Sequence, residues 1–231
     1  MSDESPAAKK RVLAIGDIHG CLTALQTLAE HVPFRPESDL LVTLGDHVDR
    51  GPDSKGVIDW LLAWKGVRVS LRGNHEIMMQ EARGSSAWVD GWRACGGAEA
   101  LASYGGGIED VPQAHWDLIN QLLPYYETET HFFVHANVLP ELDLADQSDS
   151  DLYWSQYIDP PRHKSGKKMV CGHTSQKDGL PKYNGSAACI DTWVYGKGWL
   201  TCLDVERSFY WQANQQGEVR TGILGLDGPG Y

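Results

Sequence analysis

Three consecutive segments in the first third of the sequence repeat one plan. Each begins with a short apolar run, at residues 11–15, 40–44 and 67–71, and each run ends at or near a glycine. Apolar side chains then recur about 3.6 residues apart, the spacing of a helix. Strand, glycine turn and helix in this order, three times over, predict a parallel sheet built from βαβ units.

Residues 86–123 have a helical pattern that is rich in aromatics. Trp88, Trp92 and Trp116 lie in this segment, and we interpret them as helix core or as part of a lid, because large aromatics usually supply buried area. The Tyr-Gly-Gly-Gly run at 104–107 predicts a loop and lacks the spacing of a phosphate-binding loop.

Strand-like runs return after this helical segment. They lie at 131–135, 168–171, 187–190, 200–205 and 209–212. A short polar connection joins the last two runs, which predicts an antiparallel hairpin. Together with the three earlier strands, these runs favour an α/β sandwich of two mixed β-sheets flanked by helices.

Length and charge limit what the chain can be. Its 231 residues predict a flexible tail over 1–10 and one domain over 11–231, with a helical insertion at about 86–123. The formal net charge of -11 argues against nucleic acid and membrane as partners. No secretory signal is visible, and no apolar run approaches the roughly 18 residues of a membrane span. We therefore expect a cytoplasmic protein, and in addition a monomer.

Polar motifs follow five of the predicted strands, at the edge where ligands collect in open α/β sheets. They are GDIHG at 16–20, GDHVDRG at 45–51, RGNHE at 72–76, VHAN at 134–137 and CGHT at 171–174. Each motif alone has an ordinary explanation, because a turn aspartate usually accepts a local hydrogen bond and a lone histidine is usually a core group. Five motifs at five strand ends favour one shared site.

The motifs offer carboxylates, an amide and imidazoles. This mix, without thiolate, is typical of Mn²⁺, Fe or Zn²⁺ sites and not of Ca²⁺ sites. The five cysteines are scattered and form no C-x-x-C pair, so neither a disulfide framework nor a structural zinc site is predicted. The ligand set is too large for one ion that keeps an open position.

In order and separation, these five motifs resemble those of the metallophosphoesterases, and within them of the phosphoprotein phosphatases. The likeness is greatest to the small bacterial and bacteriophage lambda type of serine/threonine and tyrosine phosphatase, and it extends from about Val12 to Val205. The resemblance implies a calcineurin-like fold with a two-metal site, for which we prefer Mn²⁺ over Fe, Zn²⁺ or Ni²⁺.

The resemblance also implies a role for each ligand. Six residues match the family's ligand positions: Asp17 and His19 for one ion, Asn74, His135 and His173 for the other, and Asp46 as the bridge. A bridging carboxylate is physically reasonable, because two dications about 4 Å apart repel strongly. A water between the ions would lose a proton and attack phosphorus in line, without a phosphoenzyme.

Four further residues would complete the catalytic machinery. Because Asn74 is taken as a ligand, its neighbour His75 is free to protonate the leaving oxygen, and Asp49 would orient the charged imidazole. Arg50 and Arg72 would face the phosphate oxygens. For Arg72, a salt bridge to an acidic neighbour is a nearly equal alternative.

The sequence departs from the family pattern at two positions. Gln156 stands where a second phosphate-binding arginine is expected after a tryptophan, and Arg162 is the alternative source of that charge. Trp193 replaces a glycine, and we favour packing over a role in the cleft wall. Of the remaining histidines, we expect His31, His115 and His163 to be surface groups.

The sequence therefore predicts a two-metal phosphomonoesterase, a serine/threonine or dual-specificity protein phosphatase acting on a phosphorylated protein or small phosphoester. The alternative is hydrolysis of dinucleoside polyphosphates such as diadenosine tetraphosphate. Relatives with that activity generally lack the second aspartate of GDHVDRG and often end the third motif with aspartate, so Asp49 and Glu76 favour the first activity. A catalytically silent binding module is disfavoured, because every expected ligand is present.

Overall fold

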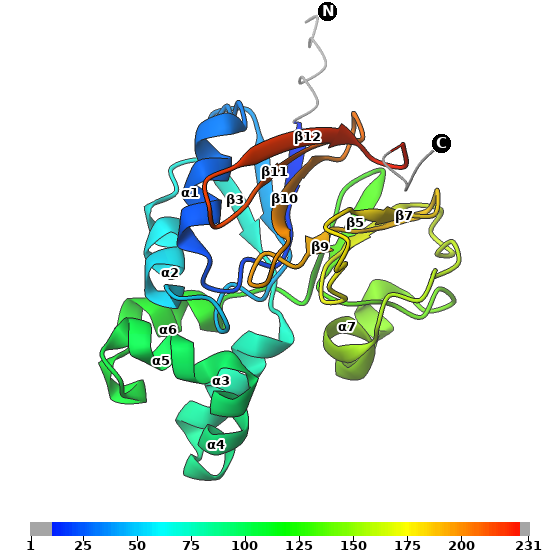
Figure 1. Ribbon diagram of the computed structural model, residues 1–231. Coiled ribbons are helices and arrows are strands. Elements are labelled where there is room, and N and C mark those ends of the chain that lie inside the picture. Colours follow the sequence, from blue (N-terminus) through cyan, green and yellow to red (C-terminus); the bar gives the residue numbers. More distant parts are fainter. Residues whose placement is uncertain (1–10, 227–231) are drawn as a thin grey trace, which may run out of the picture.

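The computed structural model describes residues 11–226, so the predicted tail over 1–10 lies outside the described residues. Two β-sheets pack face to face with helices outside them (Figure 1). The first sheet has the order β12-β11-β10-β1-β2-β3, with β9 paired to β10. Its strands are β1 Val12–Ile15, β2 Leu40–Thr43, β3 Val67–Ser70, β9 Asp191–Thr192, β10 Trp199–Asp204, β11 Phe209–Ala213 and β12 Val219–Ile223.

The second sheet has the order β4-β5-β6-β8-β7. Its strands are β4 Tyr125–Glu127, β5 His131–Val134, β6 Lys168–Cys171, β7 Lys182–Tyr183 and β8 Ala187–Cys189. Both sheets mix parallel and antiparallel pairs, since β1 is parallel to β2 but antiparallel to β10, and β5 is parallel to β6 but antiparallel to β4. The predicted sandwich of two mixed sheets is confirmed.

The repeated plan of the first third produces three βα units. Strands β1, β2 and β3 are parallel neighbours, and each leads through a glycine-containing turn into a helix. These helices are α1 Leu22–His31, α2 Ser54–Ala63 and α3 Asn74–Gly84. In parallel strands all carboxyl ends meet at one edge, so the first three motifs are neighbours in space.

Alternate residues of β1 enter different parts of the core. Leu13 and Ile15 pack in the cluster beneath α1 and α2, whereas Val12 and Ala14 face the second sheet, where Phe133 contributes. Both faces of the strand are thus buried, which explains why its sequence is apolar throughout. The outer face of the second sheet is covered by α7 Asp149–Trp154.

Residues 86–123 form a chain of short helices beyond the strand ends, with α4 farthest from the sheets (Figure 1). They are η1 Ser86–Trp88, α4 Val89–Trp92, η2 Arg93–Gly97, α5 Ala98–Tyr104, η3 Ile108–Asp110 and α6 Gln113–Asn120. Trp92 and Trp116 are buried, whereas Trp88 is exposed. Within the described residues, no helix combines the length and the apolar character that crossing a bilayer requires.

Candidate metal centre

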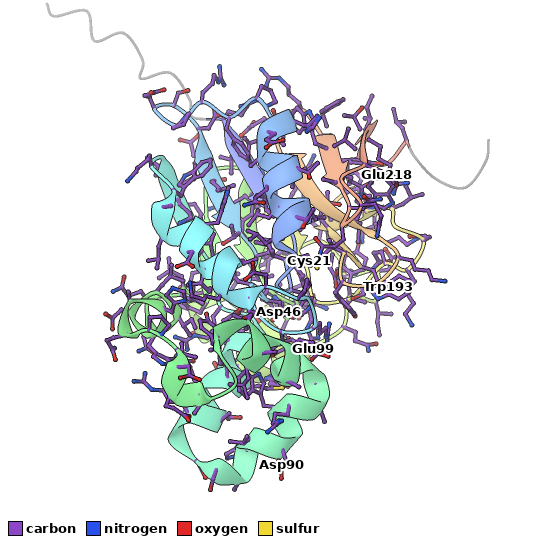
Figure 2. The ribbon with its side chains drawn as sticks, turned by 60° about the vertical axis from the view of Figure 1, so that its left-hand side comes forward. Cys21, Asp46, Asp90, Glu99, Trp193 and Glu218 are labelled. Carbon is purple, nitrogen blue, oxygen red and sulfur yellow. The ribbon has the colours of Figure 1, made fainter. Side chains whose placement is uncertain are left out.

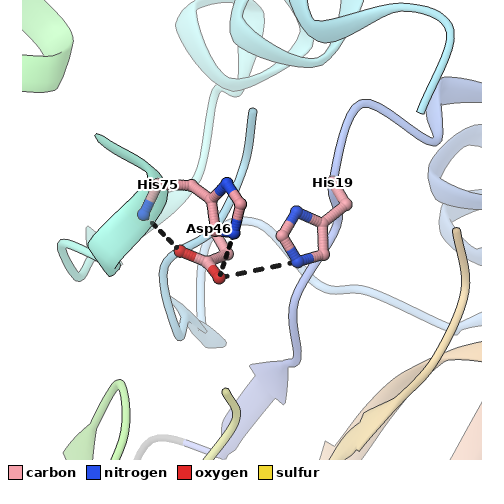
Figure 3. Close-up of side chains that lie close together, drawn as sticks. All are labelled: His19, Asp46 and His75. Atoms are coloured by element: carbon pink, nitrogen blue, oxygen red, sulfur yellow. Dashed lines mark hydrogen bonds and ion pairs between the residues drawn. The ribbon is translucent and has the colours of Figure 1, made fainter. Parts of the chain in front are cut away.

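The five motifs meet at one end of the sandwich, with Asp46 at their centre. Asp46 is buried and lies between the sheets and the helical segment (Figure 2). Its Oδ2 is 3.5 Å from Nε2 of His19 and 4.0 Å from Nε2 of His75 (Figure 3). Its Oδ1 is 3.5 Å from Nε2 of His135. One carboxylate therefore faces three imidazoles.

Two groups of ligand atoms share this carboxylate, and in each group the atoms lie within 4.8 Å of one another. The first group is His19, Asp46 and His75, and the second is Asp46, His135 and His173. Asn74 joins the second group, because its Oδ1 is 3.0 Å from both His135 Nε2 and His173 Nδ1. The structure thus brings together five of the six residues that the sequence predicts as ligands.

Backbone carbonyls fix the ring orientation of two of these histidines. His19 Nδ1 lies 3.0 Å from the carbonyl oxygen of Val48, and His135 Nδ1 lies 2.9 Å from that of Leu44. A carbonyl only accepts, so in both rings Nδ1 carries the proton and Nε2 carries the lone pair. Burial lowers the pKa of His135 to about 4, and it lowers the pKa of His19 well below its usual range. Neutral imidazoles with an anchored Nδ1 are the form that binds metal ions.

Asp17, the sixth predicted ligand, lies beside these groups and in neither of them. Its two oxygens accept the backbone N–H of His173 at 3.2 and 2.9 Å. A Cβ atom at Gly172 would stand 1.9 Å from Asp17 Oδ1, so only glycine permits this close approach. Burial and the charges of Asp191 and Asp46 raise the pKa of Asp17 well above its usual range.

Several residues of the motifs adopt a left-handed backbone. The φ angles are 47° at His19, 48° at Asp46, 73° at Asp49, 66° at Arg50 and 63° at His173. Positive φ is uncommon for residues other than glycine and persists only where the surrounding structure holds it. The concentration of such residues at the strand ends marks this edge as a functional site.

Glu76 holds the second and third motifs together. Its fully buried carboxylate accepts backbone N–H bonds from Gly73 at 2.8 Å, Asp46 at 3.0 Å, His47 at 2.7 Å and Val48 at 3.3 Å. Burial raises the pKa of Glu76, but the charge of His47 and these bonds outweigh burial and lower the pKa to about 2. Glu76 is therefore ionised and fixes the turn that carries Asp46.

His75 and Asp49 form a buried pair next to Asp46. His75 Nδ1 lies 2.7 Å from Asp49 Oδ2, so the other ring nitrogen faces Asp46. The same Oδ2 accepts the indole N–H of Trp92 at 2.8 Å. Burial raises the pKa of Asp49 well above its usual range, and the bond from Trp92 opposes that rise. Burial lowers the pKa of His75, and the charge of Asp46 opposes this.

Both predicted arginines reach this edge of the sheets. Arg50 Nη1 donates to His19 Nε2 at 2.9 Å, and its guanidinium stacks 4.5 Å from the ring centre of Tyr195. Arg72 is partly buried, its Nε has no hydrogen-bond partner, and within residues 11–226 it forms no ion pair. The salt-bridge alternative for Arg72 is therefore wrong for the described residues. Tyr195 has no sequence signal, because it belongs to none of the motifs.

A family model for calcineurin-like phosphoesterases matches residues 10–203. The chain belongs to this family. It is 45% identical to serine/threonine-protein phosphatase 1 of Salmonella typhimurium over 78 residues, which are 33% of this chain and 35% of that protein. It is 31% identical to the symmetrical bis(5'-nucleosyl)-tetraphosphatase of Pseudomonas syringae pv. tomato over 139 residues, which are 56% of this chain and 41% of that protein.

The aligned residues thus cover less than half the length of these two relatives. Among solved structures, a protein provisionally assigned as a diadenosine tetraphosphatase superposes with a TM-score of 0.67 at 20% identity, covering 96% of this chain and 97% of that one. This likeness supports the calcineurin-like fold. The relatives carry two different activities in their names, so the family is shown and the substrate is not.

The calcineurin-like phosphoesterase fold implies a two-metal site, and the residues of this chain fit one. Two ligand groups share Asp46, and both consist of carboxylate and imidazole. Burial and the charge of Glu76 raise the pKa of Asp46 to about 7, against the opposing effect of His75. Two buried carboxylates, Asp17 and Asp46, that repel each other are the arrangement that bound cations stabilise.

The structure shows where the residues lie at which this phosphoesterase departs from its family pattern. Gln156 is exposed. Arg162 donates to the carbonyl of Gly166 and lines a cavity with His131 and Lys168, where β5 and β6 begin. It therefore lies at the opposite end of these strands from the metal ligands, and it does not replace the missing arginine. Trp193 packs its ring over Gly196, where a Cβ atom would stand 2.3 Å from it.

Two histidines that we expected at the surface are buried. His115 is held between Tyr104 Oη at 2.9 Å and Asp59 Oδ1 at 3.0 Å. His163 contacts the carbonyl of Leu142 at 2.8 Å. Both predictions were wrong because long-range partners, which spacing does not reveal, satisfy the ring nitrogens. His31 is exposed, as predicted.

Proposed function

We propose that this chain is a two-metal phosphomonoesterase that acts on phosphorylated serine or threonine in proteins, with phosphotyrosine or small phosphoesters as further substrates. The observation that carries the proposal is the buried Asp49–His75 pair, at 2.7 Å, whose free ring nitrogen faces Asp46. An alkoxide leaving group must be protonated as it departs, and this pair supplies a proton donor.

Six residues would hold the two ions: Asp17, His19, Asp46, Asn74, His135 and His173. We prefer Mn²⁺, because the donor set has no thiolate. Bound ions of this kind supply an activated water and neutralise phosphate charge. His173 Nε2 is within 3.2 Å of the carbonyl oxygen of Trp154, which anchors that ring from outside.

The remaining roles belong to side chains of the chain itself. His75 would give its Nε2 proton to the leaving oxygen, a contribution of about 10²–10⁴-fold in rate. Arg50 would bind the phosphate oxygens with its planar guanidinium. Arg72, whose Nε is buried and has no hydrogen-bond partner, would be a second cation for them.

Hydrolysis of dinucleoside polyphosphates is the second candidate, and the names of several relatives support it. The two activities differ in whether the leaving group must be protonated. A nucleotide phosphate leaves readily, whereas an alkoxide needs a proton, so the Asp49–His75 pair favours the phosphomonoester.

A substrate panel tests the proposal. Protein loaded with Mn²⁺ would be assayed for kcat/KM with a phosphoserine peptide, a phosphotyrosine peptide and diadenosine tetraphosphate, with His75→Asn as the matched control. We expect the phosphoserine peptide to be preferred and to lose the most rate in the control. A large preference for diadenosine tetraphosphate would overturn the proposal in favour of the second candidate.

A further inference from the structure

The carboxylate of Asp49 has an uneven set of partners. Oδ2 accepts from Trp92 Nε1 at 2.8 Å and lies 2.7 Å from His75 Nδ1. Oδ1 is buried and has no hydrogen-bond partner among residues 11–226. A buried carboxylate is stable only when it is hydrogen-bonded, so the orientation of this group depends on two donors, and one of them is Trp92.

Trp92 comes from outside the five strand-end motifs. It ends α4 and is buried, 2% exposed. The next turn, Arg93–Gly97, contains a kink between two helices, where Gly96 has a non-helical φ of 115°.

The same turn also holds Arg50. The carbonyl of Gly96 accepts the backbone N–H of Arg50 at 3.0 Å. A Cβ atom at Gly96 would stand 2.6 Å from that nitrogen, and one at Gly97 would stand 2.4 Å from the Trp92 ring. The two glycines therefore allow the turn to lie against Arg50 and against the ring of Trp92, which itself contacts Asp49. Asp49 and Arg50 are consecutive residues, and both have a positive φ.

We propose that Trp92 is a positioning residue for the Asp49–His75 pair, and that the Gly96 carbonyl positions Arg50 in the same way. The inference deepens the proposed function and rests on it. The indole N–H fixes the rotamer of Asp49, so that Oδ2 holds His75 Nδ1 and directs His75 Nε2 toward the leaving oxygen. The helical segment is then part of the catalytic support.

Two tryptophan-to-phenylalanine variants distinguish a positioning role of Trp92 from a role in core packing alone. Trp92→Phe removes the N–H and keeps an aromatic ring, and Trp116→Phe makes the same change in the same core cluster. Trp116 is buried beneath Arg83, whose guanidinium lies 4.3 Å from its ring centre, and within residues 11–226 its indole N–H donates to no residue of the site.

Steady-state kinetics with Mn²⁺ would use phenyl phosphate, which has a poor leaving group, and p-nitrophenyl phosphate, which has a good one. For Trp92→Phe we expect kcat with phenyl phosphate to fall about tenfold, with a smaller loss for p-nitrophenyl phosphate and little change in KM. Trp116→Phe should change kcat by the same factor with both substrates. Equal losses on both substrates for Trp92→Phe, or kinetics indistinguishable from Trp116→Phe, would overturn the inference.

A double variant adds a second criterion. If Trp92 acts through His75, Trp92→Phe should cost little further rate in a His75→Asn background, because the proton donor is already absent. Losses that simply multiply would show that Trp92 acts elsewhere and would overturn the positioning role.

If Trp92→Phe does not fold, the contact can be tested by NMR, which requires no enzyme activity. In ¹H–¹⁵N spectra of the metal-free protein, Asp49→Asn should shift the indole signal of Trp92 more than that of Trp116. Equal shifts would refute the contact. A folded wild-type protein without phosphomonoesterase activity would overturn the proposed function, whereas an active one with an unaffected Trp92 signal overturns this inference alone.

Discussion

Replacing Glu76 with glutamine tests the support of the site most directly. The Glu76 side chain is fully buried and accepts four backbone N–H bonds, two on each oxygen. Oε2 accepts from Gly73 and Asp46, and Oε1 accepts from His47 and Val48. Glutamine has one oxygen only, so its amide nitrogen would face two N–H donors that have no other acceptor.

The expected cost follows from these contacts. Hydrogen bonds to a charged group contribute about 1.5–3 kcal/mol each, so losing two of them predicts a loss of about 3–6 kcal/mol in the free energy of unfolding. We take about 4 kcal/mol as the expectation, a large part of the roughly 5–15 kcal/mol of a typical domain.

Urea unfolding of metal-free protein at neutral pH measures this loss without interference from metal binding. The control is Glu81→Gln, on the exposed side of the same helix α3, and it should change the free energy by less than about 0.5 kcal/mol. A loss below about 1 kcal/mol for Glu76→Gln would refute the reasoning, because it would mean that the four bonds contribute nothing beyond what glutamine and water supply.

Three further predictions concern catalysis, metal binding and pH. His75→Asn should keep its bound metal but slow a phosphoserine peptide about 10²-fold or more, and p-nitrophenyl phosphate less; equal slowing would remove the proton-donor role. Asp46→Asn should lose metal at both sites, since both ligand groups contain Asp46; full stoichiometry by elemental analysis would contradict this. Burial raises the pKa of Asp39, but hydrogen bonds from Arg11 and Arg35 outweigh burial and lower it. A lowered pKa stabilises the fold above the unfolded value of about 3.9. Asp39→Asn should therefore be less stable than wild type at neutral pH, and urea titrations should show the difference shrinking below about pH 4; a constant difference would be evidence against the ion pair.

The predicted strands are those whose sequence is apolar over several residues. Strands β1 and β2 are buried along their whole length, and the apolar runs mark both. Strand β12 was missed because it is an edge strand of alternating exposure that contains a glycine, Val219–Ile223. Strands β7 and β9 have two residues each, too few for any periodicity to show.

The same distinction applies to the site. Metal ligands were predictable because they follow strand ends in short motifs, where spacing in the sequence determines proximity in space. Trp92 and Tyr195 were not, since each reaches the site from a different element through one contact, to Asp49 and to Arg50 respectively. The sequence indicates Glu76 only as a marker of substrate class, because its four backbone bonds depend on a fold that the motif alone does not describe.

These contacts also imply that the motifs depend on one another. The left-handed backbone at His19 is held by its N–H bond to the Asp46 carbonyl, and that at Arg50 by its N–H bond to Gly96. His173 is held by its N–H bonds to Asp17. Each of these three residues thus donates its backbone N–H to a partner from another segment. When a substitution removes one such partner, the strained backbone that it held can relax. A second substitution at the same contact then has less left to disrupt, so substitutions in two motifs should lower the free energy of unfolding by less together than the sum of their separate effects.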